Sequence, residues 1–200
     1  GYITRYVYDE RGNILVQERT FTREGLPVVA KDVFEYDARD NLLKHTDADG
    51  VTTQYSYDEN NNLLETIVDP NGLNLRTTNT YLDCCKIATT TDPEGGVISF
   101  GYDASGQIIA TTDPLGNARL NQYDERGLLV KVIEPTGDYL KYTRNSAGFI
   151  VREENYSANH TLLRRMDFTY DGNGNKQTET LYRTIDGQLV PLTTTYEYDA

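Results

Sequence analysis

Carboxylates, two histidines and two cysteines are the side chains of this chain that could do chemistry. His45 and His160 lie far apart in the sequence, and we expect each to be an ordinary strand or surface histidine. No Gly-x-Ser-x-Gly, His-Glu-x-x-His or P-loop pattern occurs. The many carboxylates fall at turn positions, where they bond backbone amides more often than they act as acid–base pairs. The sequence therefore predicts no catalytic residue, no cofactor and no enzymatic activity.

Metal and disulfide chemistry have little support in the sequence. Cys84 and Cys85 are adjacent, and since a disulfide between them would close a strained ring, we expect two free thiols. No metal-ligand spacing surrounds them, so we predict no metal site. Asp171 to Asn175 imitates the start of a calcium loop, but Lys176 and Tyr182 stand where that loop needs Gly and Glu. A turn is the better interpretation there, with weak calcium binding by the acidic surface left open.

Two formal glycosylation sequons begin at Asn155 and Asn159. They have meaning only if the chain passes through a eukaryotic secretory pathway. The net charge of −12 and the pI near 4.6 argue against nucleic acid or an anionic membrane as the main partner. The sequence has no apolar run of about 18 residues, so we expect no direct membrane insertion by this segment.

An internal repeat organises the whole chain, and its first element is the dipeptide Tyr-Asp. The full copies are Tyr8-Asp9, Tyr36-Asp37, Tyr57-Asp58, Tyr102-Asp103, Tyr123-Asp124, Tyr170-Asp171 and Tyr198-Asp199. Two degenerate copies fit between them: Tyr81-Leu82-Asp83, and Tyr142-Thr143 before Arg144 to Gly148. We assign all of these residues a structural role in the repeat.

Two kinds of turn punctuate each repeat. A Gly- and Asn-rich turn follows each Tyr-Asp, and these residues tolerate positive φ. An apolar run comes next, and then a second turn of the form Asp-Pro-x-Gly, typical of a type I turn. The second turns begin at Asp47, Asp69, Asp92, Asp113 and Glu134.

The segments between turns alternate as half-buried strands do. In residues 51–57, Val51, Thr53, Tyr55 and Tyr57 share one face, and the polar residues between them share the other. Aromatic pairs two residues apart recur, so each such strand carries two rings on one face. We expect rings of adjacent hairpins to lie side by side, where a cross-strand pair contributes about 0.2–1 kcal/mol.

These patterns predict an all-β chain of tandem β-hairpins. About nine hairpin units over residues 1–200 imply roughly 18 antiparallel strands in one long sheet, which should curl because open sheets rarely exceed about 10 strands. Three longer units hold insertions at 21–33, 155–165 and 183–195, with longer strands or a longer loop. The chain starts at Gly1 without Met and stops within a repeat at Ala200, so we interpret it as a fragment of a longer polypeptide.

The combined motif resembles that of the RHS/YD-repeat family. The stretch from Tyr102 to Gly116, YDASGQIIATTDPLG, nearly spells the repeat out, and the resemblance covers essentially all 200 residues. It departs locally: Tyr81 to Cys85 lacks the Gly/Asn turn, Thr143 replaces the Asp, and the three long units lack Asp-Pro. The resemblance implies a β-sheet that spirals into a hollow shell, and this segment would be part of the shell wall.

Two functions follow from that resemblance. In bacterial Rhs polymorphic toxins and toxin-complex BC components the shell encloses a C-terminal toxin domain, so the partners would be that domain and adjacent shell segments. The alternative is an adhesion or carbohydrate-binding module, as the teneurin branch suggests, with a glycan or cell-surface receptor as partner. Either implies a secreted or cell-surface location, bacterial for the toxin shell. Asp69 to Leu73 is similar to the family's self-cleavage string, but more repeats follow it, so we predict no cleavage there.

Overall fold

The computed structural model describes residues 3–82, 85–185 and 188–198 and divides the chain into two compact units. The first, residues 1–98, contains β1 (Ile3–Tyr8), β2 (Ile14–Arg23), β3 (Leu26–Tyr36), β4 (Leu42–Thr46), β5 (Thr52–Tyr57), β6 (Leu63–Val68), β7 (Leu75–Leu82) and β8 (Lys86–Thr91). The second, residues 99–200, contains most of β9 (Val97–Tyr102), then β10 (Ile108–Thr112), β11 (Ala118–Tyr123), β12 (Leu129–Ile133), β13 (Tyr139–Arg144), β14 (Ile150–Tyr156), β15 (Leu162–Tyr170), β16 (Lys176–Ile185) and β17 (Gln188–Thr195).

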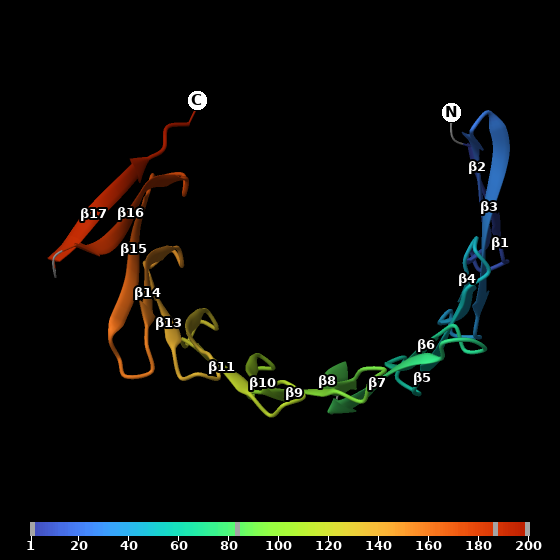
Figure 1. Cartoon of the computed structure of the whole chain (residues 1–200), viewed down its shortest axis with the longest axis horizontal. Coiled ribbons are helices and arrows are strands. Elements are labelled where there is room, and N and C mark those ends of the chain that lie inside the picture. The colour runs from blue at the N-terminus through green and yellow to red at the C-terminus, as the bar shows by residue number, and fades with distance from the viewer. Residues whose placement is uncertain (1–2, 83–84, 186–187, 199–200) are drawn as a thin grey trace. The chain divides into compact units, whose positions relative to one another are not determined.

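Each unit is an antiparallel meander in which a strand pairs with its neighbours in the sequence. The first unit runs from β1–β2 to β7–β8. The second runs from β9–β10 to β16–β17. The described residues thus form 17 strands of antiparallel sheet, which confirms the all-β hairpin prediction of about 18. Within each unit the sheet bends as strands are added (Figure 1).

Burial is slight throughout the described residues. Only Val132 and Met166 are buried hydrophobic side chains, and Asp32 is the buried charged one. In β5 the predicted alternation is confirmed from residue 53 onward, where Tyr55 and Tyr57 are half-buried while Gln54 and Ser56 are exposed. It fails at the start, where Val51 is 39% exposed and Thr52 is half-buried. Stability in such an array comes from contacts between neighbouring hairpins rather than from one central core.

Almost all of the described turns, at both ends of the strands, share one backbone design. Asp113 is typical: its N–H donates to the Asn117 carbonyl, and its carbonyl accepts from the Gly116 N–H. Gly116 has φ +84°, the left-handed region that favours glycine. This is a type I turn closed by a left-handed residue, a common three-residue hairpin loop. The Gly/Asn turns after Tyr-Asp and the Asp-Pro-x-Gly turns are therefore the same structure.

The loop at Asp69 departs from this design. It is one residue longer, with Val68 paired to Leu75: the Asn74 N–H also donates to the Asp69 carbonyl, and the Asp69 N–H donates to the Thr52 carbonyl instead of closing its own turn. Both Asp69 and Asn74 have positive φ, and Leu73 is 74% exposed. The sequence predicted an ordinary repeat turn here. The extra residue before β7 explains the difference.

The three insertions are accommodated by longer strands. β2 and β3 have 10 and 11 residues and meet at a tight turn where Glu24 and Gly25 both have positive φ. β14 and β15 keep the five-residue turn design, here from Ser157 to Thr161. β16 has 10 residues, and residues 186–187, which follow it, lie outside the described residues.

Candidate functional site

The turn aspartates act as hydrogen-bond acceptors for their own loops. Asp124 shows the arrangement: one carboxylate oxygen accepts from the backbone N–H groups of Arg126, at 3.0 Å, and Leu128, at 2.9 Å. These bonds satisfy amides that the turn leaves without a ladder partner. They also hold the carboxylate ionised, since a bond to the charged form lowers the pKa.

The lowered pKa is a property shared by many of these aspartates. In each case the largest cause is a hydrogen bond from the residue four positions later, either from its side chain or from its backbone. The aspartates with a lowered pKa are Asp9, Asp37, Asp58, Asp113, Asp124 and Asp171. These aspartates therefore stabilise the turns through hydrogen bonds to their ionised carboxylates.

The repeat tyrosine connects one hairpin to the hairpin before it. A β-bulge just before the tyrosine shifts the strand register and disturbs the ladder. In four copies the tyrosine hydroxyl donates to the carbonyl of the first residue of the preceding hairpin's second strand. The pairs are Tyr81 with Leu63 at 2.8 Å, Tyr123 with Ile108 at 2.9 Å, Tyr170 with Ile150 at 2.8 Å and Tyr198 with Lys176 at 2.9 Å.

Asparagines and aspartates surround this contact. Asn79 and Asn121, each two residues before a repeat tyrosine, donate a second hydrogen bond to the same carbonyl. Partial burial raises the pKa of Tyr81, and the negative charge of Asp58 in the preceding turn raises it further. The tyrosine thus lies against the turn of its neighbour.

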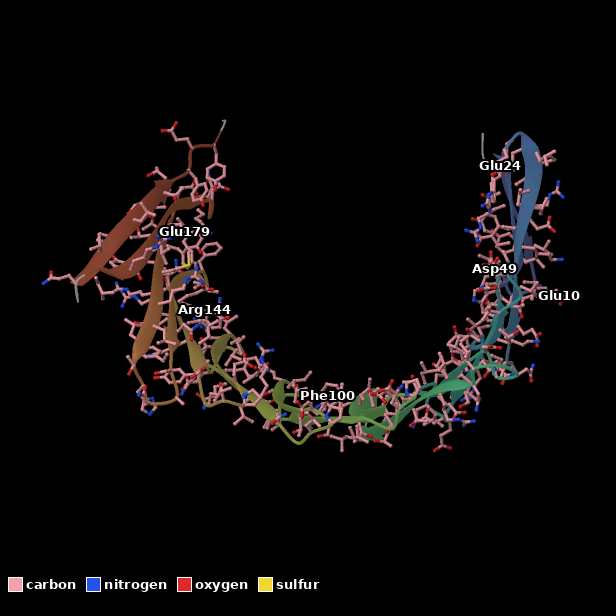
Figure 2. The ribbon with its side chains drawn as sticks, in the orientation of Figure 1. Glu10, Glu24, Asp49, Phe100, Arg144 and Glu179 are labelled. Atoms are coloured by element: carbon pink, nitrogen blue, oxygen red, sulfur yellow. The ribbon has the colours of Figure 1, made fainter. Side chains whose placement is uncertain are left out.

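The sequence prediction placed the degenerate copy near residue 142 two residues too early. The bulge falls between Thr143 and Arg144, and Asn145 forms the turn bonds that Asp forms elsewhere. Arg144 takes the tyrosine position: its Nε and Nη2 donate to the Leu129 carbonyl at 3.3 and 3.2 Å, and its Nη1 donates to the Gly148 carbonyl at 2.9 Å. Tyr142 lies two residues before Arg144, so it does not hold the position of a repeat tyrosine. Figure 2 labels Arg144 on the second unit.

A second set of contacts joins successive turns in the opposite direction along the chain. An arginine at the third turn position reaches forward to a backbone carbonyl of the next turn. Arg11 donates to the Ala38 carbonyl at 2.8 Å, Arg39 to that of Glu59 at 2.9 Å and Arg126 to that of Ser146 at 3.1 Å. The sequence prediction missed this ladder, although the arginines at matching turn positions were visible.

Ring stacking between strands is present at several places. Tyr139 and Tyr156 face each other across β13 and β14 with centroids 4.8 Å apart, and Phe149 stacks on Tyr170 at 4.9 Å. Tyr6 and Tyr8 contact each other along one strand at 6.1 Å. These contacts fit the predicted structural use of the aromatic side chains.

Two clusters in the longer hairpins, each with one aspartate among basic side chains, were not predicted. In the first unit Asp32, 6% exposed, accepts from Arg19 at 2.8 Å and lies 3.2 Å from His45 Nε2. In the second unit Asp167 is held by Arg152, at 2.8 Å, and by Arg165. Partial burial raises the pKa of Asp167, but the bonds from Arg165 and Arg152 outweigh it and lower the pKa to about 2. Both clusters need the strand register, which the sequence did not reveal.

The residues singled out for possible chemistry take structural places. His45 stacks on Phe34 with centroids 4.7 Å apart, and His160 lies in the Ser157 turn, 3.1 Å from the Tyr139 hydroxyl. Both are strand or turn histidines, as predicted. Asp171 to Asn175 forms the standard turn. Cys85 is an exposed free thiol, whereas Asp83 and Cys84 lie outside the described residues.

Metal-binding clusters and membrane-spanning helices were both sought in the described part of the chain. There, no group of three or more His, Cys, Asp or Glu side chains is placed to hold a metal ion. Across those same residues, no helix has the length and apolarity that a membrane crossing requires. An open groove of about 890 Å³ lies beside Tyr123, with Asp103 and Asp124 in its lining.

Comparison with known proteins identifies the repeat. The RHS Repeat family model matches residues 36–73 and 86–118. No curated protein matches the sequence significantly.

Solved structures share the fold at low sequence identity. The chain superposes on TcdB2-TccC3 with a TM-score of 0.77 and 15% identity, covering 96% of this chain and 12% of that one. TcdB2-TccC3-Cdc42 gives the same TM-score and coverage at 14% identity. The Tc holotoxin pore of Photorhabdus luminescens gives 0.54 at 13%, covering 98% of this chain and 16% of that one. The chain thus spans a small part of the length of these structures and has the fold of one segment of them.

Proposed function

Because this chain carries RHS repeats at residues 36–73 and 86–118, we propose that it is a structural segment of the wall of a secreted bacterial toxin shell. The wall encloses a toxin domain of the same polypeptide and joins adjacent shell segments. The observation that carries the proposal is the pair of opposed contacts between successive hairpins, backward from Tyr123 and forward from Arg126. Such contacts hold a sheet together without a central core, which is what a thin wall requires.

Further support comes from the hydrogen-bond partners of the polar side chains, which belong to the repeat array itself. The turn carboxylates accept hydrogen bonds from their own loops, as at Asp124, and four repeat tyrosine hydroxyls donate to the neighbouring hairpin, as at Tyr123. The same segment-level fold occurs in TcdB2-TccC3 with a TM-score of 0.77. A wall does no chemistry of its own, so we propose that the segment is not an enzyme.

Limited proteolysis of the longer polypeptide that contains this segment tests the proposal. We expect the enclosed C-terminal domain to resist protease in the intact polypeptide and to be digested rapidly when expressed alone. A matched variant with Arg144→Ala should shorten the protection, because it opens one hairpin interface. Equal digestion of the domain inside and outside the intact polypeptide would sink the idea.

The groove beside Tyr123 favours a second candidate, a glycan-binding surface. Its lining combines a ring with Asp103, Gln107, Asp124 and Arg126, and such mixtures of aromatic and polar groups suit small polar ligands. A broad glycan array with the 200-residue chain tests it. Binding that Tyr123→Ala abolishes would support this candidate, and a negative array would count against it.

A further inference from the structure

Two open grooves of the second unit occupy equivalent positions of the repeat. The first, of about 890 Å³, lies between the turns that begin at Asp103 and Asp124. The second, of about 580 Å³, lies between the turns that begin at Asn145 and Asp171. Each is lined by one turn, the strand that follows it, the strand that leads into the next turn, and that next turn. The grooves are therefore two copies of one site.

The residue at the third position of the first turn determines whether such an interface is bridged. Where it is arginine, the side chain crosses to the next turn and donates to the carbonyl of that turn's second residue, as Arg126 does to Ser146 at 3.1 Å. At the first groove the third position is Ser105, and at the second it is Ala147. Both side chains are too short to cross, so each groove lies at an interface without the arginine bridge.

The carbonyls that a bridging arginine would reach belong to residues that line the two grooves. These residues are Glu125 in the first groove and Gly172 in the second, and both are exposed. In the described part of the chain, no arginine donates to either carbonyl. A backbone carbonyl is a strong acceptor, and it forms a stronger hydrogen bond with a charged donor than with a neutral one. Each groove thus presents an acceptor where a bridged interface holds a guanidinium.

The other residues of the first groove also suit a guanidinium. Its lining holds three carboxylates, those of Asp103, Asp124 and Glu125, and one arginine, Arg126. The Arg126 guanidinium is paired with Asp124 at 3.2 Å and extends toward the following turn. The remaining charge of the lining is negative, and the Tyr123 ring lies among these groups. A positively charged, planar group therefore matches this groove in charge and in shape.

The second groove offers more aromatic surface and less charge. Phe149 is 40% exposed and stacks on Tyr170 with centroids 4.9 Å apart. Asp171 is the one charged residue among its lining residues. A guanidinium over an exposed ring is attracted by the negative face of that ring. The same unit already contains this kind of contact, because Arg165 lies over the Tyr182 ring at 4.5 Å.

We propose that the two grooves form a docking surface for an extended, arginine-bearing segment of a partner polypeptide. One arginine enters each groove, lies against Tyr123 or Phe149, and donates to the carbonyl of Glu125 or Gly172. The grooves lie between β10 and β11 and between β14 and β15, four strand spacings or roughly 19 Å apart. An extended chain advances about 3.3 Å per residue, so the two arginines are about six positions apart.

A second copy of this chain is not the expected partner. Its arginines at third turn positions already donate to the following turns, Arg11 and Arg39 in the first unit and Arg126 in the second. The partner's backbone runs along the row of turns and across the strands, so it does not extend the sheet. The docking goes beyond the role of a structural wall and does not depend on what the wall encloses, so either proposal can fail without the other.

Titration of a short peptide into the 200-residue chain tests the docking. The probe is acetyl-Arg-Gly-Ser-Gly-Ser-Gly-Arg-amide, and the charge-matched control has lysine in place of both arginines. In NMR spectra at physiological salt, we expect the arginine peptide to shift the amide signals of Arg126 and Asn173, which share a peptide bond with the two carbonyls. The lysine peptide should bind at least about tenfold more weakly, because an ammonium lacks the planar, forked donors of a guanidinium.

Variants at the third turn positions locate the two sites. Ser105→Arg and Ala147→Arg should fill the grooves from within the chain, as Arg126 fills its interface, and each should weaken peptide binding by at least about tenfold because two-point attachment is lost. Ser105→Arg should also raise the melting temperature, since it adds a bridge between two turns. Thr136→Arg is the matched control: it adds the same charge at the third position of a turn at the opposite ends of the strands, and it should leave binding unchanged.

Three results would overturn the docking proposal. The first is equal affinity for the arginine and lysine peptides, because the net charge of −12 would then explain the binding. The second is a loss of binding that is the same in Thr136→Arg as in Ser105→Arg and Ala147→Arg, or absent from all three. The third is glycan binding at Tyr123 without peptide binding, which would assign the first groove to the glycan candidate.

Discussion

Two neighbouring hairpin interfaces of the second unit solve one structural problem with different side chains. At the β10–β11 interface the Tyr123 hydroxyl donates to the Ile108 carbonyl at 2.9 Å. At the β12–β13 interface the Arg144 guanidinium donates to the Leu129 carbonyl through two nitrogens. Both residues follow a bulge at the same point of their strand.

The difference shows what the repeat position requires. It needs a long side chain with a donor at its end, because the ladders between these hairpins begin at Ala110 and at Lys131 and do not include Ile108 or Leu129, whose carbonyls accept from that donor. An aromatic ring is one solution, and a guanidinium is another that also reaches the Gly148 carbonyl of its own turn. The two turns differ in the same way, since Asn145 replaces the carboxylate that Asp124 provides.

Arg144→Ala should have the largest effect on this comparison. It removes three hydrogen bonds and leaves the Leu129 carbonyl without its donor, so we expect a loss of about 2–3 kcal/mol in the free energy of unfolding. Urea denaturation measures it. Arg183→Ala, an exposed arginine of the same unit, is the matched control and should cost under about 0.5 kcal/mol. Equal losses would mean that Arg144 is not a hairpin connector.

Arg144→Tyr should recover most of that loss. A tyrosine in this position can donate to the Leu129 carbonyl as Tyr123 does to that of Ile108, leaving a deficit of about 1 kcal/mol from the lost bond to Gly148. The same urea experiment on Arg144→Leu provides the comparison, since leucine has no donor. If leucine and tyrosine were equivalent, packing rather than the donor would explain the position.

Tyr123→Phe should cost about 1 kcal/mol, because it keeps the ring and removes one hydrogen bond to a backbone carbonyl. Tyr182→Phe is the control: its ring contacts Arg165, and removal of its hydroxyl should be nearly neutral. Thermal unfolding of both variants checks the prediction. An unchanged stability for Tyr123→Phe would assign the tyrosine to stacking alone.

The smallest expected effect is a different response of the Asp124 and Asn145 turns to acid. The pKa of Asp124 is lowered in the folded chain, chiefly by the bond from the Leu128 N–H, below the value of about 3.9 for an unfolded chain. Its contribution is therefore present above that value and is lost as the pH falls through the folded pKa. We expect the Leu128 amide resonance to shift during acidification in NMR spectra.

The Phe149 amide, bound to the neutral side chain of Asn145, provides the internal control. It should stay unchanged over the same pH range, and Asn145→Asp should make it respond. A shift of both amides in the unmodified chain would point to general loosening of the sheet rather than titration of one turn.

Sequence reasoning could reach the turns and strands because their signals are local. Asp113, Pro114 and Gly116 specify their turn by backbone preference alone, and the alternation around Tyr55 specifies a strand face. The contact of Tyr123 with Ile108 depends on a bulge and on strand register, which local patterns do not contain. The same limit hid the cluster around Asp32, whose partners come from two other strands.

The misplaced copy at Tyr142 had a signal that could have corrected it. Gly148 has φ +92° and closes its turn three residues after Asn145, as Gly127 does after Asp124. Counting back from the glycine identifies Asn145 as the turn residue and Arg144 as the connector. Spacing by tyrosine alone failed because the connector in this copy is an arginine.

The shared turn design also leaves the width of the sheet, measured along its strands, to be set by strand length. Where strands are joined by turns of this one design, the distance between the two rows of turns depends only on strand length: 5–6 residues in strands such as β10 and β11, or roughly 17–20 Å. β2 and β3, with 10 and 11 residues, make the sheet nearly twice as broad at one hairpin without altering the Asp9 and Asp37 turns. The outline of the sheet can therefore change one hairpin at a time, provided that residues are added in pairs so that each side chain keeps its face.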